Sequence, residues 1–136
     1  MKMRINTHDG VVSFSSGSIR AADERAGFLR SSLGRTVKSE EANGTKCQFD
    51  FDPETGISAT AFFDGERLNR VFLMFTLPSD AEGLWTEELE LERKARHDRW
   101  LAQELGSAPY QYSWGSITSD FDPRGCSSEI IIVYDR

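Results

Sequence analysis

The sequence has little cysteine and no long apolar run. Its two cysteines, Cys47 and Cys126, lie far apart, and the first residues, MKMRINTHDG, are not followed by the apolar segment of a secretory signal. Two distant cysteines in a chain without such a signal predict reduced thiols rather than a disulfide framework. No apolar stretch is long enough to cross a bilayer. We therefore expect a cytoplasmic protein that does not bind membranes.

Basic residues are also in the minority. The chain has 16 lysines and arginines against 22 aspartates and glutamates, which gives a formal net charge of -6. Nucleic acids and anionic membranes bind concentrated basic faces, so the charge argues against both as partners. A basic protein partner would be attracted instead. At 136 residues the chain has the length of one domain, and we expect residues 1–136 to form a single α+β domain.

Motifs for catalysis, cofactors and metals are missing as well. The sequence has no glycine-rich phosphate loop, no nucleophile elbow and no zinc signature. No Cys-His signature surrounds Cys126, and His97 has no second ligand four residues further on that would complete a metal pair. The glutamates within residues 87–92 are expected to form a solvated helix start rather than an acid/base pair. We predict no catalytic residue, no cofactor and no metal site, and a binding protein rather than an enzyme.

Apolar spacing predicts a mixed α and β architecture. A long helix is expected from about Thr86 to Leu105, with Thr86 as its N-cap and Gly106 after its end. The polar segment 36–46 lacks apolar periodicity and is predicted to be a surface loop, and a bulge is predicted at Gly115. The other expected elements are a hairpin at 2–14, a short helix within 18–34, and strands at 47–51, 57–63, 68–77, 110–121 and 129–134. Short links between strands favour antiparallel pairing. We predict an α+β fold with a single antiparallel sheet of about six to seven strands and two helices on one face, in the order β-β-α-β-β-β-α-β-β.

The segment DPRGC, residues 122–126, has the pattern of a turn. Asp accepts hydrogen bonds from the following amides, Pro fixes φ, and Gly takes the positive φ that closes the turn. The same Phe-Asp-Pro pattern occurs at residues 51–53, so we expect similar corners at both places. Arg124 has two interpretations: a solvated arginine at the turn tip, or a guanidinium that folds over Trp114 or onto a helix carboxylate and binds an anion. Cys126 is expected to be a half-buried strand cysteine.

One charged residue of the long helix falls on its apolar face. On a helical wheel, Asp98 lies in the middle of this face, and His97 lies beside it, where we expect it to be solvated. A buried carboxylate is costly unless it is paired or hydrogen-bonded. Asp98 is therefore predicted to accept hydrogen bonds from the C-terminal hairpin, with Arg124, Trp114 and Ser127 as candidate donors in that order. Such a bond is either purely structural or part of a functional site. The apolar face is formed by Leu91, Ala95, Leu101, Ala102 and Leu105.

The sheet face away from the helices is the expected partner surface. Aromatic side chains are frequent at the centre of protein interfaces. Tyr110, Tyr112 and Trp114 are the first candidates for this surface, with core packing as the alternative role for at least one of them. Together with Asp98 and Arg124, they form the predicted set of binding residues or of a buried polar network.

The C-terminal half resembles a group of small bacterial proteins that have no assigned activity. The resemblance rests on ERKARHDRWLAQELG, with its His-Asp-x-Trp-Leu helix, and on YQYSWGSITSDFDPRGCSSEIIIVY, with its Trp-Gly…Asp-Pro-Arg strand pair. It implies a bacterial source and no mechanism. The segment GSIRAADERAGFLRSSLG is similar to a unit of small binding modules such as outer-membrane assembly lipoproteins, but the lipoprotein signal of those proteins is missing here. That similarity implies only a binding fold.

Three functions are consistent with the sequence. The first is a noncatalytic protein-binding module, in particular an immunity or antitoxin-type inhibitor that captures a basic partner through charge complementarity. The second is a small-molecule binder or enzyme with a cleft between the long helix and the C-terminal hairpin, using Asp98 and Arg124. The third is a dimerising structural protein. The first is the preferred prediction.

Overall fold

The structure, a computed structural model, describes residues 1–83 and 85–135. The helices are α1 (Arg25–Arg30) and α2 (Glu87–Leu105), with the 3-10 turns η1 (Gly34–Thr36) and η2 (Pro78–Glu82). The strands are β1 (Arg4–Ile5), β2 (Val12–Phe14), β3 (Gly17–Ile19), β4 (Val37–Asn43), β5 (Lys46–Glu54), β6 (Ile57–Asp64), β7 (Arg67–Phe75), β8 (Tyr110–Tyr112), β9 (Gly115–Asp122) and β10 (Ser127–Tyr134).

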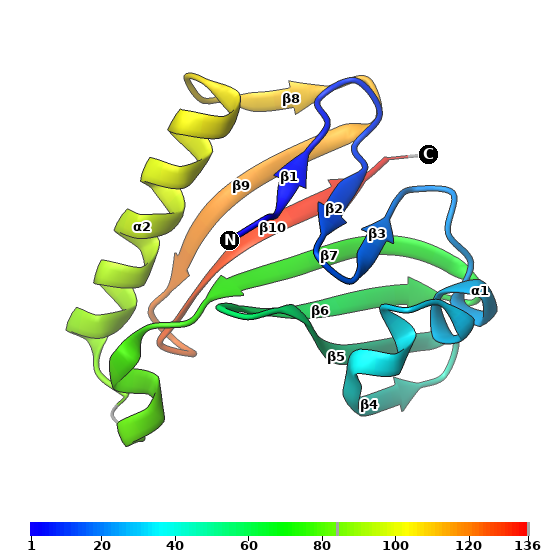
Figure 1. Cartoon of the computed structure of the whole chain (residues 1–136), viewed down its shortest axis with the longest axis horizontal. Coiled ribbons are helices and arrows are strands. Elements are labelled where there is room, and N and C mark those ends of the chain that lie inside the picture. Colours follow the sequence, from blue (N-terminus) through cyan, green and yellow to red (C-terminus); the bar gives the residue numbers. More distant parts are fainter. Residues whose placement is uncertain (84, 136) are drawn as a thin grey trace.

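The main sheet is antiparallel and confirms the predicted α+β class. Its seven strands follow the order β4-β5-β6-β7-β10-β9-β8. The prediction of one sheet needs a correction, because β1, β2 and β3 form a separate three-stranded sheet. These strands have two or three residues each, so they pair with one another as a small unit. Figure 1 shows this blue unit lying over the large sheet, between α1 and α2.

Both helices cover the same face of the large sheet, as predicted. Alternate residues of its central strands point to this face and are buried, as the period of two in a strand requires. From α1, Phe28 packs against the rings of Phe49, Phe51 and Phe63 at centroid distances of 5.9, 5.2 and 5.6 Å. Helix α2 lies along β9 and β10 (Figure 1). One hydrophobic core therefore joins the two sheets and the helices.

The start and end of α2 follow from its sequence. The hydroxyl of Thr86 accepts a hydrogen bond from the amide of Leu89, which satisfies one of the free donors at the helix start. Gly106 ends the helix with a φ of 85°, a conformation that favours glycine. The predicted helix limits are therefore confirmed.

Strand β4 corrects the prediction of a loop at residues 36–46. It pairs with β5 at the edge of the large sheet, and its residues from Lys38 to Asn43 are all exposed. A strand at the edge with both faces in water needs no alternation of apolar residues, so periodicity could not find it. The corner expected over residues 51–56 lies only at its glycine end. Strand β5 continues through Pro53 to Glu54 with a register irregularity, and the turn is formed by Thr55 and Gly56, whose φ is 91°.

A hairpin replaces the bulge predicted at Gly115. Strand β8 ends at Tyr112, which pairs with Gly115 across a turn formed by Ser113 and Trp114. A Cβ atom at position 115 would lie 1.9 Å from the carbonyl oxygen of Val133, so only glycine allows β9 to start here. The close backbone approach therefore explains the glycine that the sequence analysis assigned to a bulge.

Candidate protein-binding surface

The turn at residues 122–126 is a structural corner. The amide of Arg124 donates a hydrogen bond to Oδ1 of Asp122 at 3.0 Å, which confirms the predicted Asp turn. The positive φ falls on Cys126, at 48°, and not on the glycine before it. Cys126 thus belongs to the turn and is not a strand residue. The Arg124 side chain is 95% exposed, and its one ion pair among the described residues is a 3.8 Å contact with Asp122.

Asp98 is half exposed, which corrects the buried position predicted for it on the apolar helix face. Its side chain is 48% exposed, and it accepts a hydrogen bond from Nζ of Lys94 at 2.9 Å. Partial burial raises the pKa of Asp98, but the hydrogen bond and charge of Lys94 and the nearby hydroxyl of Ser119 on β9 outweigh it and lower the pKa below its usual value. None of the three predicted donors, Arg124, Trp114 and Ser127, forms a described hydrogen bond with it. Asp98 is therefore a surface carboxylate.

The three candidate aromatic residues lie on the covered side of the sheet. Tyr110 is 8% exposed and its hydroxyl donates to the carbonyl of Gly106. Tyr112 stacks on Trp114 with a centroid distance of 5.2 Å, and the Trp114 indole donates to the carbonyl of Thr7 at 2.9 Å. These aromatics therefore hold the N-terminal hairpin against β8 and do not form the open partner surface that the sequence analysis expected.

A buried ion network, which the sequence analysis missed, fixes α2 to the sheet. Arg93 is 1% exposed, and its guanidinium donates to both carboxylate oxygens of Glu90, to both of Asp80 and to the carbonyl of Phe75. All five guanidinium N–H groups thus have acceptors. Glu90 also accepts from the amide of Ser128 at 3.0 Å. The expectation of a solvated glutamate at this position is therefore wrong.

These contacts set the charge states within the network. Burial lowers the pKa of Arg93, but hydrogen bonds to Asp80 and Glu90 outweigh it and raise the pKa further above its usual value. The hydrogen bond from Arg93 in turn lowers the pKa of Asp80. The ionised network therefore ties α2 to η2, to the end of β7 and to the start of β10.

His97 is fully buried, which corrects its predicted solvated position. Its Nε2 accepts a hydrogen bond from the amide of Phe75 at 3.1 Å, so the neutral ring carries its proton on Nδ1. Burial lowers the pKa of His97 to about 4, and the charges of Arg93 and Lys94 act in the same direction. The missed signal is a stripe at positions i, i+3, i+7 and i+11 of one helix face, formed by Glu90, Arg93, His97 and Leu101.

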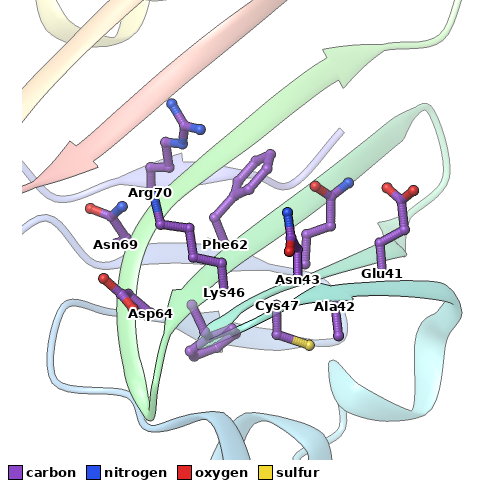
Figure 2. A pocket seen from close by; sticks show the side chains of 11 residues that line it. Glu41, Ala42, Asn43, Lys46, Cys47, Phe62, Asp64, Asn69 and Arg70 are labelled. Carbon is purple, nitrogen blue, oxygen red and sulfur yellow. The ribbon is translucent and has the colours of Figure 1, made fainter.

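The other face of the large sheet is open in the part of the chain that the structure describes. Phe62 and Phe72 meet there at a centroid distance of 4.7 Å, and the guanidinium carbon of Arg70 lies 4.7 Å from the Phe62 ring centroid and 5.2 Å from that of Phe72. A hollow of about 350 Å³ lies beside them. Figure 2 shows Phe62 and Arg70 on one side of it, and Glu41 and Asn43 on the other. A second hollow of about 280 Å³ lies further along this face.

A cleft of about 530 Å³ lies between α2 and the β8–β9 hairpin, next to the predicted position between the long helix and the C-terminal hairpin. Asp98 and Lys94 form part of its wall, whereas Arg124 is not among the residues that line it. The described residues contain no cluster of three metal-ligating side chains and no helix that is long and apolar enough to span a membrane.

The comparison with solved structures shows a similar fold. A chain in the structure described as "Rhs1-CT in complex with cognate immunity protein RhsI1" matches this chain with a TM-score of 0.55 and 16% sequence identity. The match covers 97% of this chain and 86% of that chain, so the similarity extends over the whole fold. No family model and no curated protein matches the sequence.

Proposed function

We propose that this protein is a noncatalytic module that binds another protein, and that it acts as an immunity or antitoxin-type inhibitor. The observation that carries the proposal is the open sheet face, where Phe62, Arg70 and Phe72 lie together. Aromatic residues and arginine are the types that most often dominate interface energies. The similarity to a chain of the Rhs1-CT and RhsI1 complex supports this class of function. The net charge of -6 favours a basic partner.

Affinity capture and reconstitution test the proposal. The tagged protein is used to capture partners from cells of its source at low and at moderate salt. We expect one stoichiometric basic partner, an on-rate that falls with ionic strength, and a partner that inhibits bacterial growth unless this chain is co-expressed. Arg70→Ala should weaken the complex, whereas Arg99→Ala, an exposed arginine on α2, should not. A partner whose toxicity is unchanged by this chain, or no partner at either salt, would count against the inhibitor function.

A second candidate function is small-molecule binding in the cleft between α2 and β8–β9. The position of the cleft and the Lys94–Asp98 pair on its wall favour it. A metabolite screen by thermal shift tests this function, with Asp98→Asn as the comparison. A ligand that stabilises the wild type but not Asp98→Asn would support it. A dimer in sedimentation equilibrium with no partner and no ligand would instead support the structural alternative.

A further inference from the structure

One half of the open face carries carboxylates that repel one another. Glu129 on β10 pairs directly across from Asp120 on β9, and Asp122 is the next residue of β9 on the same face. Like charges directly opposite each other destabilise an antiparallel sheet. None of the ion pairs among the described residues includes Glu129 or Asp120. The isolated protein therefore holds an uncompensated negative pair on its open surface.

The environment of Glu129 shows the same imbalance. Partial burial raises its pKa above the usual value, and the charges of Glu90, Asp122 and Asp120 raise it further. A hydrogen bond with Ser127 acts in the opposite direction but does not reverse the shift. A cation placed beside Glu129 would relieve both the repulsion and the cost of burial.

A hollow with apolar and polar lining lies directly beside this carboxylate. It has a volume of about 280 Å³, and Phe72, Met74 and Glu129 line it together with the polar side chains of Asp50, Ser58 and Thr60. The single basic residue that lines it, Lys38, already contacts Asp52 at 3.1 Å. An aromatic ring and a thioether next to an unpaired carboxylate match a side chain with a long aliphatic stem and a planar charged end.

We propose that this hollow receives an arginine side chain of a basic protein partner. Its guanidinium pairs with Glu129 beside Asp120, and its stem lies over Phe72 and Met74. Arginine fits better than lysine because its planar fork binds a carboxylate with two hydrogen bonds and stacks on an aromatic ring. This inference rests on the proposed function, because it names the surface and the chemistry by which the partner is recognised.

The first test compares stability with binding in Glu129→Gln. Relief of the repulsion should raise the melting temperature of the isolated protein by roughly 1–4 °C. Loss of the charge should raise the Kd for the captured partner at least about tenfold, or about 1.4 kcal/mol. Glu88→Gln, which removes the same charge from an exposed position on α2, should leave the Kd within about twofold. A partner that still binds and is still inhibited, with unchanged Kd in Glu129→Gln, would overturn this inference and leave the proposed function standing.

The second test needs no partner. An acetylated hexapeptide of alternating arginine and leucine is titrated into the isotope-labelled protein, in parallel with peptides that carry citrulline or lysine instead of arginine. We expect amide shifts at Phe72, Glu129 and Ile131 with the arginine peptide, weaker binding with lysine and none with citrulline. Shifts confined to the cleft beside Asp98, or equal binding of the citrulline peptide, would refute the site. Equal affinity for lysine would refute the preference for arginine.

Discussion

Replacing Arg93 by methionine should destabilise the protein strongly. The substitution removes all the hydrogen bonds of the guanidinium and leaves Glu90, which is 1% exposed, with the amide of Ser128 as its remaining described donor to the carboxylate. Removing one partner of a buried ion pair costs about 3–5 kcal/mol, because the other charge stays buried without compensation. We therefore expect the free energy of unfolding to fall by about 4 kcal/mol.

Urea unfolding at neutral pH, followed by tryptophan fluorescence, measures this loss. Arg96→Met is the matched control, because Arg96 lies on the same helix and its contact with Glu92 at 3.3 Å joins side chains that are 44% and 51% exposed. A surface pair of this kind contributes about 0.5 kcal/mol or less. The double variant Glu90→Leu/Arg93→Met removes both buried charges and should recover much of the lost stability.

The ranking of the three variants decides whether the reasoning is right. If Arg93→Met lost no more stability than Arg96→Met, the network would not hold α2 on the sheet. If the double variant were far less stable than Arg93→Met, then the uncompensated charge of Glu90 would not be the source of the loss. Either result would refute the argument from buried charge.

Three further substitutions, one of them with a matched control, test separate features. Burial lowers the pKa of His97 in the folded state to about 4, against its usual 6.5, so between these pH values the unfolded state binds one proton more than the folded state. Acidification from pH 7 to 4 should therefore lower the free energy of unfolding of the wild type by about 3 kcal/mol more than that of His97→Gln, as measured by urea titration. Cys126→Gly should raise the free energy of unfolding by about 0.5–1 kcal/mol, because it relieves a φ of 48°, and a lower melting temperature would contradict this. Gly115→Ala should lower the free energy of unfolding by about 3 kcal/mol or more, because its Cβ atom would clash with the Val133 carbonyl. Gly44→Ala is the control: its Cβ position is open, so it should lower the free energy of unfolding by about 1 kcal/mol.

The elements that bury one face were predictable from the sequence. The limits of α2 follow from the hydroxyl of Thr86 and from Gly106, which are local signals. The central strands follow from alternating or continuous apolar residues. Strand β4 could not be predicted in this way. It pairs with β5 through backbone groups on one of its edges, and its exposed side chains show no alternation of apolar and polar residues.

The site residues were harder to predict for a physical reason. A hydrophobic wheel turns the apolar face of α2 toward the sheet, which places Asp98 inside and His97 at the flank. The structure turns the helix so that Glu90, Arg93 and His97 face inward. Leu91, which the wheel assigned to the core, is 47% exposed. A hydrophobic wheel assumes that the buried face of a helix is apolar. This assumption fails for α2, because a hydrogen-bonded ion network lies on its buried face.

The open face is where this chain can differ most from others with the same fold. The similar chain has 16% sequence identity and shares the arrangement of helices and strands. Such an arrangement is kept when the core residues change, as long as they stay apolar and of suitable size. Residues on an open sheet face do not need to be apolar or to fit a core, so their charges can determine which partner binds. A like-charge pair such as Glu129 and Asp120 lowers the stability of the isolated protein, and binding sites often retain residues that are unfavourable for stability. A variant at Glu129 that gains stability and loses affinity would therefore separate a recognition role from a structural one.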